Sequence, residues 1–220
     1  MSKQIVIFIA PPGAGKGTQA NLLAEKFGLV HIETSKIIEA KLKDADPNDP
    51  AMAEEKRKWL SGELNTPAIV KDWLLGKVSE LAAENKSIVL SASPRTLYEA
   101  EAGMPEFEKL YGRGNIKVFH ITLSEEESMK RNSGRRICEK NRHPIPNFPE
   151  YQNLTTCPQD GSPLITRALD KPEVIRERYR VYKVETEPVL DYLKKDGYTI
   201  IVINGEQPIE KVFEDILKNF

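Results

Sequence analysis

The chain has 220 residues, of which 40% are hydrophobic and 30% charged, and its formal net charge is -1 at pH 7. This composition is typical of a soluble globular protein, and the near-neutral charge excludes the strong positive field of many nucleic-acid-binding proteins. The clean apolar run at residues 5–10 is too short for a membrane span or a signal peptide. We therefore expect a cytoplasmic protein that binds neither nucleic acid nor a membrane.

Five short runs of apolar and β-branched residues predict buried strands, and helical patterns lie between them. Strands that alternate with helices indicate the α/β class, here a five-stranded parallel sheet with helices on both faces. The predicted strands cover residues 4–9, 29–32, 87–90, 117–122 and 198–203.

Short local signals predict where several of the helices begin and end. A cap residue before proline, or a capping box of two side chains three residues apart, is typical of a helix start. A glycine directly after a helical pattern is typical of a helix end. The start signals are Thr66-Pro67, Ser124 with Glu127, and Asp170 with Glu173, and the end signals are Gly28 and Gly197.

Two stretches interrupt the alternation of strands and helices. Residues 35–66 contain two helical patterns around D46-P-N-D-P50, and residues 137–166 are rich in Pro, Asn and Thr and lack a helical period. We expect both to be insertions at the loop ends of the sheet, where α/β proteins bind their ligands.

A glycine-rich turn joins the first predicted strand to a helical pattern over residues 19–27, and it reads A10-P-P-G-A-G-K-G-T18. Strand, loop, lysine and helix in this order predict a phosphate-binding loop. Backbone N–H groups would surround the phosphates, Lys16 would supply a point charge, and Thr18 lies where a hydroxyl faces Mg²⁺. The strict pattern has Gly at 10 and Ser or Thr at 17, whereas this chain has Ala10 and Gly17. A glycine-rich turn without a ligand is the alternative interpretation. The expected phosphate-binding residues are Gly13, Ala14, Gly15, Lys16, Gly17 and Thr18.

Several motifs in this order together resemble the adenylate kinases, which are nucleoside monophosphate kinases, in their long-lid form. They are P-G-A-G-K-G-T-Q, Pro94-Arg95-Thr96, Gly134-Arg135-Arg136 and L164-I-T-R167 followed by V174-I-R-E-R178. The resemblance covers essentially the whole chain. It implies a P-loop NTPase-type core at residues 1–34, 67–133 and 169–220, an NMP-binding (acceptor) domain at 35–66 and a lid at 134–168. The implied reaction is reversible, Mg²⁺-dependent phosphoryl transfer from ATP to AMP, giving two ADP by direct in-line attack.

The resemblance also assigns roles to a set of cations, because phosphoryl transfer gathers negative charge that positive groups must stabilise. Arg95 would hold the α-phosphate of the acceptor, and Arg131 would stack near the ATP adenine. Solvated surface arginines are the alternative, which we prefer for Arg136 and Arg176. The implied catalytic residues are Lys16, Arg95, Arg135, Arg167 and Arg178. Beyond the loop, ATP would contact Arg131, Arg135 and Gln207. AMP would contact Thr34, Lys36, Glu39, Asn65, Arg95, Glu99, Arg167 and Arg178.

The magnesium side departs from the family pattern. The family has Asp-Gly-Phe before Pro-Arg-Thr, whereas this chain has Ser91-Ala92-Ser93. The missing aspartate normally orders Mg²⁺ through bound water, and the Ser91 hydroxyl carries no charge. Glu33 ends the neighbouring strand, and we hypothesise that it supplies the missing charge. Mg²⁺ is therefore expected near Thr18, Ser91 and Glu33.

The acceptor side departs as well. Where the family has Asp and Arg three residues apart, this chain has Lys36 and Glu39, so the acid and the base have traded places on one helical face. Lys36 could meet the acceptor phosphate, with Glu39 paired to Lys36 or Lys43, or the pair is simply a solvated surface pair. Glu99 stands where a glutamine reads adenine, which either loosens the preference for AMP or requires a protonated Glu99.

The two cysteines fall in the expected lid, where the family often carries a zinc knuckle. Its four positions read Cys138, Asn141, Cys157 and Asp160. Asn141 is a poor zinc ligand, and the nearby His143 could take its place. A metal-free cluster of polar side chains is an alternative, and a disulfide is a third one, disfavoured in a reducing cytosol.

Three functional hypotheses follow. The first is an active adenylate kinase, the second is a nucleoside monophosphate kinase with a different or broader acceptor, and the third is a nucleotide-binding homologue without turnover. The complete set of converging cations favours the first. The resemblance implies a monomer that uses Mg²⁺ and whose partners are ATP and AMP.

Overall fold

A parallel sheet forms the centre of the computed structural model, which describes residues 3–46, 48–141, 143–147, 151–166 and 170–220. Within this described part the strand order is β2-β3-β1-β4-β8, and each neighbouring pair is parallel. The strands are β1 (Ile5–Ile9), β2 (Val30–Ile32), β3 (Ile88–Leu90), β4 (Ile116–Thr122) and β8 (Ile200–Asn204). The five predicted strands are confirmed, with their ends shifted by at most two residues.

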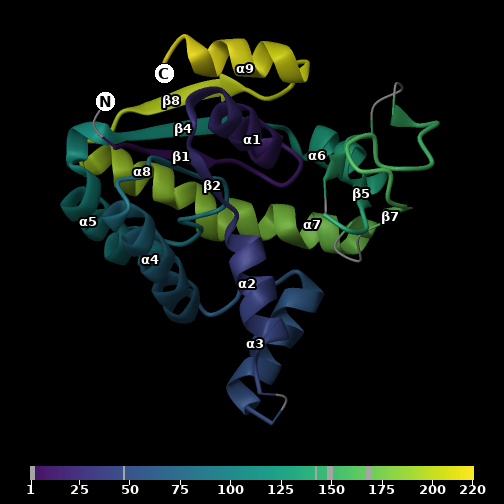
Figure 1. Ribbon diagram of the computed structural model, residues 1–220, viewed down its shortest axis with the longest axis horizontal. Helices are drawn as coiled ribbons and strands as arrows, with labels where there is room; N and C mark the ends of the chain where they lie inside the picture. Colours follow the sequence, from purple (N-terminus) through teal and green to yellow (C-terminus); the bar gives the residue numbers. More distant parts are fainter. Residues whose placement is uncertain (1–2, 47, 142, 148–150, 167–169) are drawn as a thin grey trace.

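Helices cover both faces of this sheet because its strands direct their side chains alternately into two cores. Along β1, Ile5 and Ile7 lie in one hydrophobic cluster, whereas Val6 and Phe8 lie in the other. Figure 1 shows α4 and α9 on opposite sides of the sheet, which confirms the α/β class. No helix of the described residues is long and apolar enough to cross a membrane. The first core is covered by α4 (Pro67–Ala83), α5 (Leu97–Tyr111) and α8 (Glu187–Lys195), and the second by α1 (Lys16–Phe27) and α9 (Ile209–Leu217).

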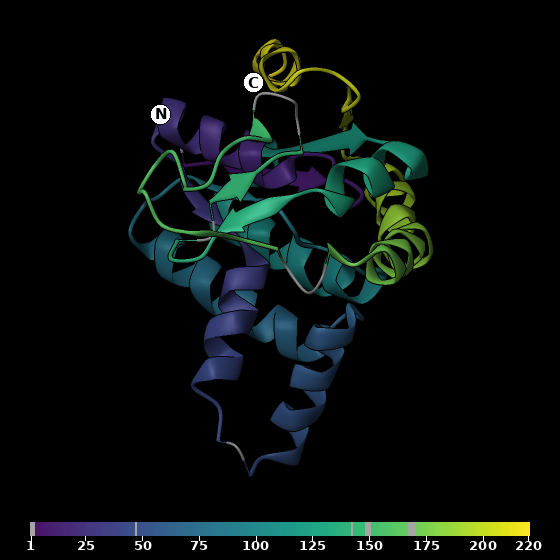
Figure 2. The same ribbon diagram turned by 90° about the vertical axis from the view of Figure 1, so that its right-hand side faces the viewer.

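Two helices extend away from the sheet within residues 34–61 (Figure 1, Figure 2). They are α2 (Thr34–Lys43) and α3 (Pro50–Ser61). The side chain of Asp49 accepts hydrogen bonds from backbone N–H groups at the start of α3, and Gly62 ends this helix with a φ of 85°. The two helical patterns predicted around residues 46–50 are therefore confirmed.

The second interruption forms a small antiparallel sheet in the described residues, with the strand order β6-β5-β7. Its strands are β5 (Arg136–Cys138), β6 (Pro144–Ile145) and β7 (Leu164–Ile165). It lies between α6 (Glu125–Ser133) and α7 (Pro172–Val181) in the sequence. A 3-10 turn (Arg113–Asn115) precedes β4, and a π-helical turn (Tyr182–Thr186) joins α7 to α8.

Some of the predicted helix starts use different partners from those expected. The Ser124 hydroxyl accepts from the N–H of Glu127 as predicted, but the N–H of Ser124 donates to Glu206 instead of completing the box. Pro67 begins α4 as predicted, yet Thr66 makes no side-chain cap. The predicted ends at Gly28 and Gly197 are confirmed by positive φ angles of 67° and 89°.

The capping box predicted for Asp170 with Glu173 is wrong. Helix α7 starts at Pro172 after Lys171, with no side-chain cap. The carboxylate of Asp170 instead receives two hydrogen bonds from the guanidinium of Arg135. A bidentate, charge-assisted pair of this kind is stronger than a bond to a single backbone N–H.

Candidate active site

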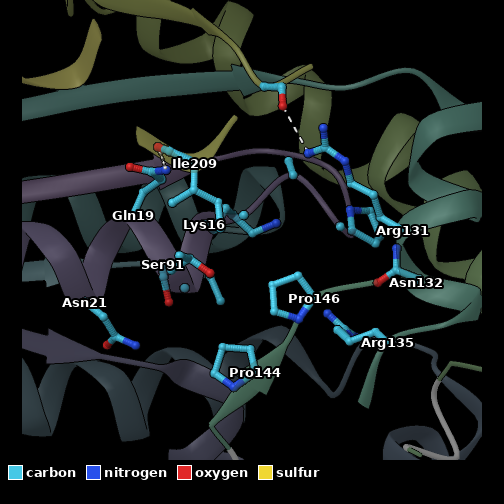
Figure 3. A pocket seen from close by; sticks show the side chains of 18 of the residues that line it. Lys16, Gln19, Asn21, Ser91, Arg131, Asn132, Arg135, Pro144, Pro146 and Ile209 are labelled. Carbon is cyan, nitrogen blue, oxygen red and sulfur yellow. Dashed lines mark hydrogen bonds between the residues drawn. The ribbon is translucent and has the colours of Figure 1, made fainter. Parts of the chain in front are cut away.

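The main cavity lies above the glycine-rich loop and has a volume of about 260 Å³. Figure 3 shows Lys16 and Ser91 on one side of it, and Arg131 and Arg135 on the other. The predicted residues that line it are Gly13, Ala14, Gly15, Lys16, Gly17, Thr18, Glu33, Lys36, Ser91, Arg131, Arg135, Arg178 and Gln207.

The loop has the backbone expected of a phosphate site. Gly13 and Gly15 both adopt a φ of 83°, and helix α1 begins at Lys16 without a side-chain cap, which leaves its N–H groups available to an anion. A Cβ atom at Gly13 would lie 2.5 Å from the amide nitrogen of Asn132, so glycine is required there. Ala10 directly follows β1, is buried and belongs to the second hydrophobic cluster; it does not line the main cavity.

Four cations converge beside this loop. The ammonium of Lys16 donates to the carbonyl oxygens of Ala10 and Pro11 at 2.7 and 2.9 Å. Burial holds the pKa of Lys16 well below its usual range, and the charges of Arg95, Arg178 and Arg135 lower it further. Such mutual repulsion marks a place where a bound polyanion would stabilise the protein.

A buried carboxylate holds two of these cations. The two oxygens of Asp170 accept from Nη2 and Nε on one edge of the Arg135 guanidinium, at 2.5 and 3.0 Å, and one of them lies 3.7 Å from a nitrogen of Arg178. Arg95 is held differently, because its Nε donates to the carbonyl of Ala92 at 2.7 Å. The predicted Arg167 lies outside the described residues.

The far end of the main cavity contains Arg131 and Gln207. Arg131 donates to the carbonyl of Gly205 at 3.0 Å, which Figure 3 shows as a dashed line, and binds Glu127 at 2.8 Å. The amide of Gln207 donates to the carbonyl of Asn204 at 2.8 Å. This end therefore combines a flat guanidinium with backbone groups, which suits a nucleobase.

A second cavity, of about 120 Å³, meets the first at Lys16 and Arg178. It is also bordered by Arg95, by Leu64 beyond α3, and by Tyr182 in the π-helical turn. Two ligand spaces thus share one group of cations, which is the arrangement needed to bring two phosphate-bearing molecules together.

Several predicted acceptor residues are engaged by other groups. The amide of Asn65 donates to the backbone oxygen and the carboxylate of Glu55 at 2.7 and 2.9 Å, and Asn65 lines neither cavity. The hydroxyl of Thr34 shares a hydrogen bond with Ser93 at 2.9 Å. Sequence reasoning missed Glu55, whose side chain is only 3% exposed although it lies in a helix rich in charged residues.

Lys36 has a partner that was not among the alternatives considered for it. Its ammonium binds the carboxylate of Glu33 at 2.5 Å, across the start of α2. Glu33 and Lys36 both line the main cavity, whereas Glu39 lines neither of the two. The swap of acid and base therefore brings the charge of Lys36 to Glu33, which lies between β2 and α2.

Glu99 is buried and lines neither of these two cavities, but borders a smaller pocket behind Pro94. Its carboxylate accepts from the backbone N–H of Arg95 at 2.7 Å. Burial raises the pKa of Glu99, although this hydrogen bond, the charge of Arg95 and a bond with Ser93 oppose the shift. The neutral form of the side chain is therefore favoured relative to an exposed glutamate, and a neutral acid has one O–H donor, as an amide has N–H donors.

The three residues expected to hold magnesium all offer oxygen ligands. The hydroxyls of Thr18 and Ser91 and the carboxylate of Glu33 all line the main cavity, and hard oxygen ligands fit Mg²⁺. His31 is the residue that sequence reasoning missed here. Its Nε2 lies 2.8 Å from the Ser91 hydroxyl and its Nδ1 lies 2.6 Å from the amide oxygen of Asn21.

Four potential zinc ligands meet beside the small sheet. The ligand atoms of Cys138, His143, Cys157 and Asp160 all lie within 4.8 Å of one another. The side chain of Asn141 donates to Asp160 at 2.7 Å, so it supports the cluster from outside. Both cysteines are free thiols, so the disulfide alternative is not present in this structure.

The fold and this site define a P-loop phosphotransferase that brings two nucleotides together. Residues 8–198 match the family model described as adenylate kinase. Similar proteins named adenylate kinase occur in Petrotoga mobilis (38% identity, 98% of both chains), Archaeoglobus fulgidus (35%, 96% of this chain and 95% of the relative) and Chlamydia trachomatis serovar D (33%, 98% and 89%). The chain belongs to the adenylate kinase family. It is a nucleoside monophosphate kinase of the adenylate kinase type, and this family uses Mg²⁺ with ATP. The hypotheses of another acceptor or of lost turnover are not favoured.

Proposed function

We propose that this chain transfers the γ-phosphoryl group of Mg·ATP to AMP by direct in-line attack, without a covalent enzyme intermediate. The observation that carries the proposal is that two cavities meet at Lys16 and Arg178. ATP occupies the larger cavity and AMP the smaller one. The test is ADP formation from ATP with AMP, CMP, UMP, GMP or dAMP. Turnover with AMP far above the others supports the proposal, and better turnover with another monophosphate refutes it.

On the donor side, the loop amides of residues 13–18 and the ammonium of Lys16 bind the ATP phosphates. Lys16 then exchanges its contacts with the Ala10 and Pro11 carbonyls for charged phosphate oxygens, which are stronger partners. Arg131 stacks on the adenine, and Gln207 borders it.

At the reacting phosphoryl group, Arg135, Arg167 and Arg178 stabilise the charge of the transition state, and Arg95 holds the α-phosphate of AMP. Asp170 keeps the guanidinium of Arg135 oriented before the phosphates arrive. We also assign Thr34 and Lys36 to the acceptor; Lys36 lines the larger cavity and would reach AMP when residues 35–66 close over the core. Glu99, as a neutral acid, faces the adenine edge. For Asn65 and Glu39 we propose a supporting role only, because Asn65 is engaged by Glu55.

The residues that would hold magnesium are Thr18, Ser91 and Glu33, through their oxygen atoms and bound water. When bound, the ion neutralises charge on the ATP phosphates. Lys36 competes for the Glu33 carboxylate at 2.5 Å, so Glu33 contributes less negative charge than the missing aspartate would.

We propose that residues 35–66 act as the NMP-binding domain and residues 134–168 as the lid, and that both close over the core formed by 1–34, 67–133 and 169–220. Closure excludes water, which would otherwise hydrolyse ATP. The protein acts as a cytoplasmic monomer without nucleic-acid or membrane partners. Sedimentation of the free protein tests the monomer.

The lid would hold structural Zn²⁺ through Cys138, His143, Cys157 and Asp160. Two thiols, an imidazole and a carboxylate are a donor set that zinc accepts in tetrahedral geometry, and their present separation within 4.8 Å requires only a small contraction. Metal analysis of untagged protein is expected to give about one zinc per chain. A stoichiometry near zero would leave the hydrogen-bonded polar cluster as the form of the lid.

A further inference from the structure

The hydroxyl of Ser91 is tied to a histidine on the neighbouring strand. Ser91 follows β3, and His31 lies in the middle of β2, which pairs with β3 in parallel. The Oγ of Ser91 lies 2.8 Å from Nε2 of His31. Figure 3 shows Ser91 and Asn21 on the same side of the main cavity as Lys16. The Ser91 hydroxyl therefore faces the space proposed for the nucleotide.

The contacts of His31 fix which of its nitrogens carries the proton. Nδ1 lies 2.6 Å from the amide oxygen of Asn21 and 3.9 Å from a carboxylate oxygen of Glu33. An amide oxygen and a carboxylate oxygen on the Nδ1 side favour a proton on that atom. In the neutral imidazole Nε2 is then an acceptor, so the Ser91 hydroxyl donates to it.

A hydroxyl whose proton is committed in this way can only accept from its other neighbours. Water bound to Mg²⁺ donates its hydrogens, and a carboxylate at position 91 would accept them. An unrestrained serine hydroxyl could turn its own proton toward that water and present the wrong polarity. The structure prevents this, because Ser91 is 4% exposed and its proton has a buried acceptor.

We propose that His31 is a positioning residue that orients the Ser91 hydroxyl as a hydrogen-bond acceptor for magnesium-bound water, in place of the carboxylate that the family has at this position. The inference rests on the proposed binding of Mg·ATP in the main cavity. Asn21 completes the arrangement by holding the His31 tautomer. The result is a neutral chain of groups from Asn21 through His31 to Ser91 that takes over the orienting part of the aspartate's role.

The test measures metal affinity separately from turnover. Mn²⁺ serves as a spectroscopic substitute for Mg²⁺, and its affinity for the complex of the protein with a bisubstrate dinucleotide is measured by electron paramagnetic resonance. His31→Phe should weaken Mn²⁺ binding about 3- to 10-fold, the worth of one hydrogen bond, with the metal-free affinity for the dinucleotide unchanged by calorimetry. His31→Gln, whose amide oxygen can accept from Ser91, should stay within about 2-fold of the parent.

A second pair of variants tests whether the effect of His31 depends on the hydroxyl of Ser91. With Ser91→Asp, adding His31→Phe should no longer change Mn²⁺ affinity, because a carboxylate accepts without an oriented proton. An equal loss in both backgrounds, or no loss in the parent background, overturns the proposal. If His31→Phe does not fold, Ser91→Ala with His31 intact should give the same 3- to 10-fold loss, and no loss there also overturns it. Absence of ADP formation by the parent would refute the proposed function instead, while leaving Mn²⁺ binding measurable.

Discussion

Removing the charge of Asp170 should destabilise the free protein far more than the nucleotide-bound protein. The side chain of Asp170 is 3% exposed and is bound by Arg135 at 2.5 and 3.0 Å. One such pair at about 4 Å between charge centres is worth about 4 kcal/mol at an effective dielectric near 20. The two arginines are 19% and 25% exposed, so solvent reduces this value. We expect Asp170→Asn to lower the free energy of unfolding by about 2–3 kcal/mol.

This prediction differs from ordinary destabilisation because a bound nucleotide should restore the stability of Asp170→Asn. Phosphates that bind Arg135 and Arg178 supply the negative charge that the variant lacks. Urea denaturation with a saturating bisubstrate dinucleotide should therefore show a difference between variant and parent below about 1 kcal/mol. Asp191→Asn is the matched control, because Asp191 is 76% exposed and 3.8 Å from Lys194; it should cost less than about 0.5 kcal/mol. An equal loss with and without the dinucleotide would refute the view that Asp170 stands in for phosphate.

Three further changes test other parts of the site. Lys16→Met should lower turnover at least about 100-fold while the free energy of unfolding stays equal or rises, because a buried charge is removed; urea denaturation beside the kinetic assay checks both. Glu99 has a raised pKa from burial, so its contribution to stability is present at low pH and lost as pH rises through that pKa. The free energy of unfolding of Glu99→Gln should therefore rise relative to that of the parent as the pH increases above about 4.5, the ordinary pKa of a glutamate, and a difference in urea titrations that stays constant with pH would contradict this. Chelation should lower the Tm of the parent but not of Cys157→Ser, and equal shifts would argue against lid zinc.

The sheet and the phosphate loop could be predicted because their signals are local. A buried parallel strand is an apolar run, and the loop is a contiguous motif between strand and helix. Asp170 shows the limit of such signals. An acid two residues before a helical proline suggests a cap, yet its actual partner is Arg135, 35 residues away. The carboxylate of Asp170 can occupy only one position, and it binds the stronger partner although that partner is distant in the sequence.

Glu55 and His31 could not be predicted for a related reason. Glu55 lies in a helix rich in charged residues and looks like a solvated glutamate, but it receives hydrogen bonds from the backbone and hydroxyl of Thr66 after the chain turns back. His31 looks like an interior strand residue, and only the pairing of β2 with β3 brings it to Ser91. Both roles depend on how elements pack, which no spacing within one element encodes.

The contacts of the cations explain how the free protein keeps so much positive charge in one place. Lys16 is bound to the carbonyls of Ala10 and Pro11, and Arg95 to that of Ala92. These acceptors are neutral, whereas Arg135 and Arg178, among the cations that the structure describes, share the charge of Asp170. A phosphate can therefore displace the carbonyls without leaving a buried anion unpaired, since carbonyl oxygens lose only a modest hydrogen bond. The binding of phosphate therefore relieves the mutual repulsion of these cations.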